Sequence, residues 1–406
     1  MTEKMLLYKR KIIRQLFFTE ALSCTALSSR VHKSIPLITT VLADLIATGE
    51  VMEIGQAPST GGRRPVMYSL APNVFYVVCV AMDQFTTRIA VMDVQTKMLH
   101  NLEQFELPLQ QNSNALSALT KKIKEVIKKS NIPKEKLIGI GIGMPGFIDV
   151  QKGVNYTFLP VPEGSITAYI QQETSLSAFI DNDSSLIALA ELRFGAASRT
   201  KNTMVINLGW GVGLGMILNG ELFRGHNGFA GEFSHIPIFS NGKLCSCGKT
   251  GCLETETSLL VLIEKAKNGL NAGRQSALKS HQLEHYEQAV EAIVEAVKHG
   301  DQFVVELFSE AGYNIGRGIA ILIHLMNPEV VILSGRGSKA GRVWFAPIQQ
   351  ALNEHSIPRL AASTLLEQSA LGYEAELIGA AALVMEYFDS DMKSHVRPKE
   401  STVSLN

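Results

Sequence analysis

Four side chains that can bind a metal lie within the segment HIPIFSNGKLCSCGKTGC. They are one histidine and three cysteines: His235, Cys245, Cys247 and Cys252. Three thiolates and one imidazole suit tetrahedral zinc, and four protein ligands leave no open position at which the metal could do chemistry. The spacing Cys-x-Cys is less common in such sites than Cys-x-x-Cys. These residues predict a structural zinc knuckle.

A second group with chemical potential is the arginine pair in STGGRRP, residues 59–65. Arg63 and Arg64 follow two glycines, between strand-like segments at 50–55 and 66–70. Guanidinium groups at the tip of a two-stranded wing can hold phosphates or enter the minor groove of DNA. The loop by itself is equally compatible with a solvated hairpin.

Three helical patterns precede this loop and must position it. They cover residues 6–18, 25–32 and about 35–48, with Ser34 expected as the N-cap of the third helix and Gly49 as its stop. Apolar residues at helical spacing are expected to face inward: Leu6, Ile12, Ile13, Leu16, Phe17, Leu37, Ile38, Val41, Leu42, Leu45 and Ile46.

Three helices with a short turn before the third have the spacing of a helix-turn-helix, in which the third helix enters the major groove. The residues expected to face DNA are Ser34, Pro36, Thr39, Thr40, Arg63 and Arg64. Residues 1–72 are therefore predicted to be a winged helix-turn-helix domain, and its partner is predicted to be double-stranded operator DNA.

Composition and charge agree with a small DNA-reading head on a larger globular body. The 406 residues are 46% hydrophobic and 19% charged, and the net charge is zero. Residues 1–72 carry nine lysines and arginines against five acidic residues, so the rest of the chain is slightly acidic. Five cysteines make no disulfide framework, and neither a secretion signal nor a membrane span is evident, which favours the cytoplasm.

After residue 73 the pattern is that of an α/β body. We expect strands at 75–83, 87–94, 98–107, within 136–149, and at 177–182, 204–209, 212–223 and 329–335. We expect helices at about 115–129, directly after 182, between 258 and 326, and at 372–388. A run of strands followed by helices occurs twice, which predicts two lobes, at 73–195 and 196–388, with a cleft between them. The final helix could pack back on the first lobe, and residues 389–406 are expected to form a polar tail.

At this point the residues resemble a known family. GHNGFAGEFSHIPI followed by CSCGKTGCLET is similar to the signature of the ROK family of repressors, open reading frames and kinases, and the resemblance extends from residue 1 to about 388. The head ending in STGGRRP resembles the NagC/XylR/Mlc-like regulator branch. The resemblance implies a two-lobed actin-like, RNase H-like sugar-kinase fold behind a winged head.

The resemblance also implies a sugar site. The positions that match the family's sugar-contacting residues are Gly146, Asn182, Asp183, Glu232, His235 and Glu254, and His235 would ligate zinc as well. Carboxylates and an amide are suited to vicinal hydroxyls. An N-cap role for Asp183 is an open alternative, alone or together with sugar binding. Ser185 and Ser234 depart from the family pattern, so the particular sugar or sugar phosphate is left open.

The same comparison favours a sensor over a kinase. Where the family's first phosphate loop reads DxGGT, this chain has Asp83-Gln84-Phe85-Thr86-Thr87, and Trp210 replaces a small hydroxyl residue in the second loop. Glycines at 209, 211, 213, 215, 335 and 337 survive, although they also suit ordinary turns.

We therefore expect a sugar-responsive transcriptional regulator, most simply a repressor, without catalytic residues. A homodimer or homotetramer is expected because winged heads usually read paired half-sites. Two alternatives remain: a hexose or amino-sugar kinase with a DNA-binding head, in which Asp183 is the base, and a DNA-binding protein whose body only oligomerises or docks another protein.

Overall fold

A computed structural model describes residues 3–57, 64–99, 102–161 and 164–389. The chain divides into two compact units. Unit 1 consists of residues 1–142, 148–181 and 380–406, and unit 2 consists of residues 143–147 and 182–379. Among the described residues, no helix is long and apolar enough to cross a bilayer.

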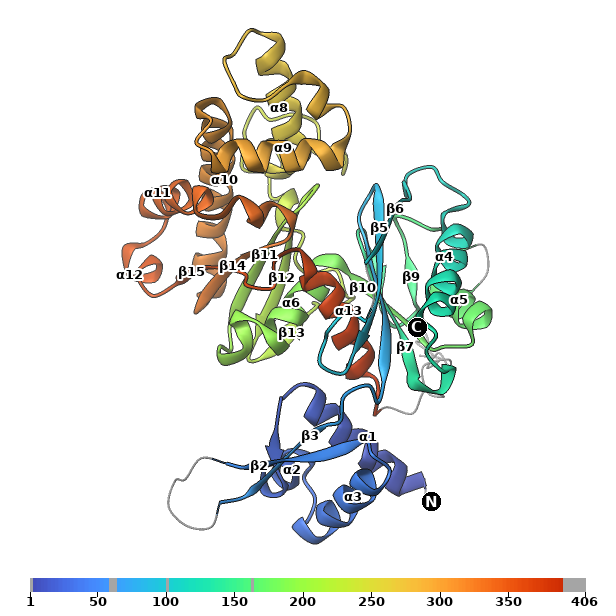
Figure 1. Ribbon diagram of the computed structural model, residues 1–406. Coiled ribbons are helices and arrows are strands. Elements are labelled where there is room, and N and C mark those ends of the chain that lie inside the picture. The colour runs from blue at the N-terminus through green and yellow to red at the C-terminus, as the bar shows by residue number, and fades with distance from the viewer. Residues whose placement is uncertain (1–2, 58–63, 100–101, 162–163, 390–406) are drawn as a thin grey trace, which may run out of the picture. The chain divides into compact units, whose positions relative to one another are not determined.

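The head at the start of unit 1 has three helices and a small sheet (Figure 1). Its helices are α1 (Glu3–Phe17), α2 (Cys24–Val31) and α3 (Ile35–Ala47). Its strands are β1 (Leu22–Ser23), β2 (Val51–Gln56) and β3 (Val66–Leu70), in the order β1-β3-β2. The β2–β3 hairpin is the wing, so the predicted winged helix-turn-helix is confirmed, with β1 as an unpredicted third strand.

The inward faces of the head helices follow the predicted spacing with two exceptions. Leu6 and Ile46 are 38% and 37% exposed, whereas Ile38, Val41 and Leu45 are fully buried or nearly so. Ile46 lies about 100° around the helix from the buried Leu45, so it faces away from the core. Leu6 lies in the first half of α1 and is also exposed. Those two core predictions were wrong.

Ser34 occupies the N-cap position of α3 as predicted, but its side chain makes no capping hydrogen bond. Its extended backbone (φ −65°, ψ 148°) and the proline in the first turn of α3 are enough to begin the helix there. At the other end, the helix stops at Ala47, and Gly49 follows with φ of 75°, which favours glycine.

Two of the head's basic residues are held by acids within unit 1. The Lys9 ammonium is buried and lies 2.7 Å from Asp44 of α3. Arg14 of α1 forms ion pairs with Glu386 and with Asp389, the latter at 3.3 Å. Part of the positive charge counted in the sequence therefore stabilises the fold.

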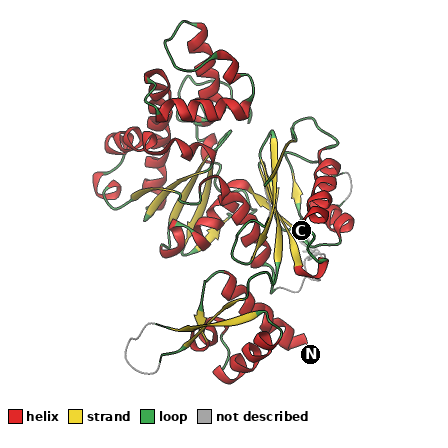
Figure 2. Ribbon diagram, viewed as in Figure 1, coloured by secondary structure: helices red, strands yellow, loops and turns green. Residues whose placement is uncertain are grey.

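The remainder of unit 1 is built on a five-stranded sheet with the order β10-β7-β4-β5-β6. Its strands are β4 (Tyr76–Met82), β5 (Thr86–Asp93), β6 (Glu103–Glu106), β7 (Leu137–Met144) and β10 (Ala178–Asn182). A small pair follows β7, made of β8 (Ile148–Asp149) and β9 (Val154–Asn155). Helices α4 (Ala115–Ser130) and α5 (Ile166–Thr174) lie beside the sheet (Figure 2).

Unit 2 contains a second five-stranded sheet with the order β13-β12-β11-β14-β15. Its strands are β11 (Thr203–Leu208), β12 (Val212–Leu218), β13 (Glu221–Phe223), β14 (Val330–Ser334) and β15 (Leu365–Gln368). Its helices are α6 (Asp183–Phe194), α7 (Glu254–Thr257), α8 (Leu259–Asn271), α9 (Tyr286–Lys298), α10 (Gln302–Met326), α11 (Phe345–His355) and α12 (Pro358–Ala361). The closing helix α13 (Ala375–Glu386) contributes residues to both units.

Short 3₁₀ helices complete the chain at Lys134–Lys136, Ala196–Arg199, Phe233–His235, Ser280–Leu283, Arg336–Trp344 and Gly372–Glu374.

Two of the predicted strands differ from the observed ones. The segment 212–223 is the hairpin β12–β13, because Asn219 and Gly220 both take positive φ and turn the chain. Within the described part of 98–107, the strand is the shorter β6, which pairs with β5 as the predicted meander requires. The strand β15 and the helices α5, α11 and α12 were not predicted.

The parallel pair β11 and β14 positions the candidate site in unit 2. Because the pair is parallel, Leu208 and Ser334 end at the same edge of the sheet, and the loops 209–211 and 335–337 begin there. This edge is where α/β proteins usually bind their ligands.

Candidate functional site

Asn182 and Asp183 lie where β10 ends and α6 begins. Asn182 is the N-cap of α6: its Oδ1 accepts from the amides of Ser184 (3.0 Å) and Ser185 (3.3 Å). Its Nδ2 donates to the carbonyl of Gly146 (3.3 Å), so two predicted sugar-site positions are directly bonded. Asp183 is the first helical residue, so the alternative that gave it the N-cap is wrong. Helix α6 thus presents an amide and a carboxylate side by side.

The carboxylate of Asp183 is held by a buried polar network. Its Oδ1 accepts from the Ser184 amide (2.8 Å), and its Oδ2 accepts from Asn207 Nδ2 (3.2 Å) at the end of β11. The same Asn207 amide donates to Ser184 Oγ (3.1 Å). Neither Ser184 nor Asn207 was predicted as a site residue. Ser184 adjoins Asp183 in the sequence and could have been identified from that position, whereas Asn207 shares no local motif with Asp183.

Three carboxylates act on one another electrostatically in this part of unit 2. Burial raises the pKa of Glu232, and the negative charges of Glu254 and Asp183 raise it further, while His235 opposes the shift. His235 Nε2 lies 3.7 Å from Glu232 Oε2. Glu232 is therefore within electrostatic range of three other predicted positions, Asp183, His235 and Glu254, of which Asp183 is distant from it in sequence. Several acceptors close together are what a ligand with several hydroxyls requires.

The glycines that survive in the loops leave space for this network. A Cβ on Gly211 would lie 2.7 Å from Glu254 Oε2, and one on Gly213 would lie 1.9 Å from Ser184 Oγ. A Cβ on Gly335, where φ is 78°, would lie 2.2 Å from Asn207 Oδ1. Packing against the site's own side chains therefore accounts for these three glycines.

The four predicted metal ligands form one cluster. The ligand atoms of His235, Cys245, Cys247 and Cys252 all lie within 4.8 Å of one another. His235 Nδ1 is 3.5 Å from Cys245 Sγ, and the sulfurs of Cys247 and Cys252 are 3.6 Å apart. Ligands about 2.3 Å from a tetrahedral zinc lie about 3.8 Å from one another, so the donor set fits such an ion.

His235 joins the metal cluster to the carboxylates. One ring nitrogen, Nδ1, faces the cysteine sulfurs, and the other, Nε2, faces Glu232. A metal-bound histidine usually directs its second nitrogen to a carboxylate or carbonyl, which fixes the ring. The orientation of His235 is therefore consistent with both roles that the family resemblance implied.

The loops after β11 and β14 are joined by a buried cation between aromatic rings. Trp210 and Arg336 are 4% and 6% exposed. The Arg336 guanidinium lies 4.3 Å from the centre of the Trp210 ring and 4.7 Å from that of Tyr373, and it pairs with Glu287 of α9 at 2.7 Å. Tyr286 completes the group with an edge-on contact to Trp210. Side chains of the protein fill this part of the sheet edge.

In the turn at 83–87 in unit 1, the Asp83 carboxylate accepts hydrogen bonds from the backbone that follows it. Asp83 Oδ1 accepts from the amides of Phe85 and Thr86, both at 2.8 Å, and its Oδ2 accepts from the Thr86 hydroxyl. The turn joins β4 to β5, with the Asp83 amide donating to the Thr86 carbonyl. A carboxylate therefore takes the amides that a phosphate would need.

In the head, the predicted DNA-facing residues Ser34, Pro36, Thr39, Thr40 and Arg64 are all exposed. Arg63 lies outside the described residues. The hydroxyls of Thr39 and Thr40 donate to carbonyls one turn earlier, which leaves their methyl groups as outward contacts.

Two further basic residues, Arg30 and Lys33, lie exposed at the α2–α3 turn. They were not predicted, although a basic turn just before a recognition helix is a signal that could have identified them.

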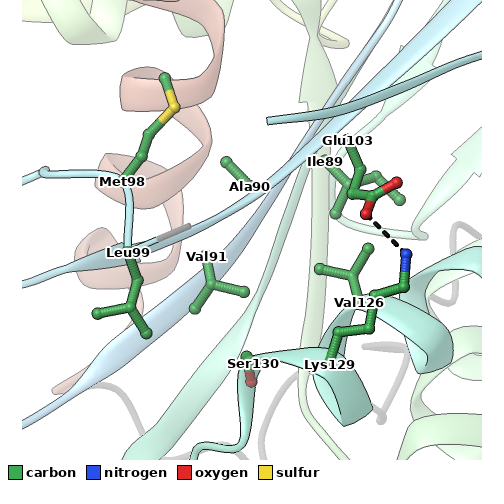
Figure 3. Close-up of a pocket in the computed structure, with 9 residues that line it drawn as sticks. All are labelled: Ile89, Ala90, Val91, Met98, Leu99, Glu103, Val126, Lys129 and Ser130. Carbon is green, nitrogen blue, oxygen red and sulfur yellow. Dashed lines mark hydrogen bonds and ion pairs between the residues drawn. The ribbon is translucent and has the colours of Figure 1, made fainter. Parts of the chain in front are cut away.

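A cavity of about 570 Å³ in unit 1 lies between β5, α4 and the residues Met98, Leu99 and Glu103 (Figure 3). Its lining is mainly aliphatic, and Lys129 and Glu103 form an ion pair at its edge (2.8 Å). It lacks the converging amide and carboxylate groups found in unit 2, so it is not a second candidate for a polyol site.

Comparison with known proteins gives one family. The sequence profile described as "ROK family" matches residues 77–387. A glucokinase of Halalkalibacterium halodurans is 34% identical over 265 residues, which are 64% of this chain and 80% of the glucokinase. A xylose repressor of Caldicellulosiruptor bescii is 28% identical over 393 residues, which are 95% of this chain and 96% of the repressor.

The fold has a counterpart among solved structures. A transcriptional regulator of the same family, described as a homologue of the Escherichia coli MLC protein, superposes with a TM-score of 0.76. The match covers 94% of this chain and 97% of that one at 24% identity. The α/β fold predicted from the sequence is confirmed, and it is built on two five-stranded sheets.

Proposed function

The chain belongs to the ROK family, and from that premise we propose that it is a sugar-responsive transcriptional regulator, a repressor of carbohydrate-utilisation genes. The proposal depends on one observation, that the same chain contains two features. One is a winged head, and the other is a group of carboxylates and an amide in unit 2 that are suited to sugar hydroxyls. The similarity to a xylose repressor over nearly the whole of both chains supports this branch of the family.

The proposed effector site consists of Gly146, Asn182, Asp183, Glu232, His235 and Glu254. In this site the carboxylates accept from vicinal hydroxyls, while Asn182 both donates and accepts. Binding of a sugar shifts the population between arrangements that do and do not hold operator DNA, which requires the sugar to bind them unequally. The effector is a sugar or sugar phosphate.

The proposed DNA interface is the exposed face of α3 with its preceding turn and the wing. Thr39 and Thr40 would contact base edges through their methyl groups, while Arg30, Lys33 and Arg64 would hold phosphates. A homodimer or homotetramer in the cytoplasm would present two heads to paired half-sites.

We propose that His235, Cys245, Cys247 and Cys252 hold one structural zinc ion. A zinc with four protein ligands supplies no catalysis. What it supplies is rigidity, because it fixes the segment 235–252 and with it the ring of His235 beside Glu232.

We propose that the chain is not an enzyme. The Trp210–Arg336–Tyr373 stack fills the sheet edge beside β11 and β14, and the Asp83 turn uses the amides that a phosphate would need. In each unit by itself, a phosphate group would therefore have to displace side chains of the protein: the neutralised Arg336 in unit 2 and the Asp83 carboxylate in unit 1.

The direct test combines binding and output on the full-length chain. Melting temperature is measured across monosaccharides, amino sugars and their phosphates, and release of promoter DNA is measured with the same compounds at fixed salt. We expect one sugar class both to raise the melting temperature and to change DNA affinity. If no sugar changes the melting temperature or the DNA affinity, the result would instead support the alternative in which residues 73–388 dock another protein.

A hexose or amino-sugar kinase with a DNA-binding head is the second candidate. It is favoured by the 34% identity to a glucokinase and by the position of Asp183, whose carboxylate would take the proton of the attacking hydroxyl. ATP-dependent phosphorylation of a sugar that Asp183→Asn abolishes would establish the kinase, and absence of turnover across the panel would reject it.

A further inference from the structure

Asn207 is a buried amide at the end of β11 that no sequence motif singled out. It is 8% exposed, and its Nδ2 is 3.2 Å from Asp183 Oδ2 and 3.1 Å from Ser184 Oγ. A buried primary amide is costly unless its donors are used, and here one donor group is directed at a carboxylate. The position of Asn207 is therefore tied to that of Asp183.

The backbone leaves room for this amide in two places. A Cβ on Gly335 would lie 2.2 Å from Asn207 Oδ1, and a Cβ on Gly213 would lie 1.9 Å from Ser184 Oγ, the second partner of Asn207. Gly335 follows β14, whose Ser334 is the register partner of Asn207, so the amide lies between β14 and α6. The amide is enclosed, and its rotation is restricted.

Hydrogen bonds from two elements, α6 and β11, orient the plane of the Asp183 carboxylate. Oδ1 accepts from the Ser184 amide at the start of α6, and Oδ2 accepts from Asn207 on the neighbouring sheet. A carboxylate that contacts two hydroxyls of one sugar must keep its plane fixed to distinguish one configuration of those hydroxyls from the other. Without Asn207, Oδ2 would lose this donor, while Ser184 would still hold Oδ1 through its amide and its hydroxyl. The negative charge of Glu232 would then act on a carboxylate that is held on one oxygen by α6 and no longer by Asn207 on the other.

We propose that Asn207 is a positioning residue of the effector site: it fixes the Asp183 carboxylate so that the site discriminates between epimeric hydroxyl pairs of a sugar. The inference rests on the proposed function, because it assumes that Asp183 contacts the effector. Asn207 itself touches Asp183 and Ser184, and it acts on the sugar only through Asp183.

The test measures affinity of the full-length chain for glucose, mannose and galactose, which differ at single hydroxyls, and for xylose and N-acetylglucosamine. Asn207→Leu removes the donor at nearly constant volume, and Asn207→Asp places a second carboxylate against Asp183. We expect Asn207→Leu to weaken binding of the best probe about tenfold, because a hydrogen bond to a charged group is lost, and Asn207→Asp to weaken it more, because a second negative charge is added. The ratio of affinities between epimers should shrink in both variants.

Asn314→Leu is the matched control. Asn314 has the same 8% exposure, and its side-chain Oδ1 accepts a hydrogen bond from Arg317, but it lies in α10. The variant Asn314→Leu should have a lower melting temperature. Its sugar affinity and its ratio of affinities between epimers should stay within about twofold of the wild type. A purely structural role for Asn207 would give the same pattern as this control.

A double variant tests the pairing directly. Asp183→Asn combined with Asn207→Asp restores an amide facing a carboxylate, so the melting temperature lost in Asn207→Asp should return, whereas sugar affinity should not. Wild-type binding with unchanged epimer ratios in both single variants would overturn the positioning role alone. A wild-type chain that binds neither these sugars nor their phosphates would contradict the proposed function, and the positioning role with it.

Discussion

The guanidinium of Arg336 is buried between the rings of Trp210 and Tyr373 and is neutralised by Glu287. Cation–π contacts become stronger when the cation is removed from water, and an arginine can stack and form an ion pair at the same time. At the residue scale, this stack stabilises the edge of the unit 2 sheet by filling it.

Arg336→Met tests how much this cation stabilises the fold. Breaking a buried ion pair leaves its partner carboxylate unpaired and costs about 3 kcal/mol, and the two ring contacts are lost as well. We expect the free energy of unfolding, measured in urea, to fall by about that amount.

Lys298→Ala provides the comparison, because the pair between Lys298 and Glu295 is on the surface of α9. No measurable change is expected there. Equal effects of the two substitutions would mean that Arg336 does not stabilise the sheet edge.

At the scale of elements, short connections between distant segments hold unit 2 together. The segment 235–252 is folded back by its own backbone pairs, Pro237 with Cys252 and Leu244 with Thr250, and its four metal ligands close it. The end of α6 is joined to the loop after β15, where the Ser369 hydroxyl donates to Glu191.

Removal of the metal with a strong chelator should lower the melting temperature, because an ion bound only by the folded state stabilises that state. Re-addition of zinc should restore the temperature. Cys247→Ser should lower the melting temperature without chelator and reduce the response to it. A metal content below one zinc per chain in the purified protein would contradict the proposed site.

Glu191 should make stability depend on pH. Burial raises the pKa of this carboxyl, while hydrogen bonds from Ser369 and from the Ala196 amide oppose the shift. The folded chain therefore keeps this proton at a pH where the unfolded chain has lost it. Stability from this group is fully present below the ordinary carboxyl pKa and is lost as pH rises through the raised value.

Glu191→Gln removes that dependence. Its free energy of unfolding relative to the wild type should increase steadily as pH rises above about 5, whatever constant cost the amide adds. Urea unfolding of both proteins at several pH values measures the difference. A difference that stays constant across the series would show that Glu191 keeps its ordinary pKa.

At the scale of the whole molecule, the candidate sites are divided between the two units. The head belongs to unit 1, whereas the six proposed sugar-site residues and the metal ligands all belong to unit 2. The two activities can therefore be altered separately.

Arg64→Ala should weaken binding of a nonspecific DNA duplex about equally for all sequences. Because the arginine is expected to hold a phosphate, the slope of log affinity against log salt should fall by about one. Fluorescence anisotropy at several salt concentrations measures the slope. Lys152→Ala, an exposed change in the body, should leave the slope unchanged, and an unchanged slope for Arg64→Ala would place the wing away from DNA.

The sequence by itself determined what depends on neighbours along the chain. The metal ligands are confined to one short segment, the head helices follow their apolar spacing, and Asn182 and Asp183 adjoin at a strand-to-helix junction. Local periodicity and motif spacing carry such information directly. The Asn219-Gly220 turn was equally local and was still missed.

Only the tertiary structure decided which distant residues meet. Asn207 reaches Asp183, and Arg336 reaches Trp210, because β11 lies beside β14 in the sheet and α6 packs against β11 and β12. The order of the strands depends on how much apolar surface the whole unit buries, and a short segment of sequence does not determine that quantity. The glycines after β11 and β14 illustrate the difference. The sequence was compatible with a phosphate loop or an ordinary turn. The structure gives the physical reason for these glycines, because the side chains of Ser184, Asn207 and Glu254 pack against them.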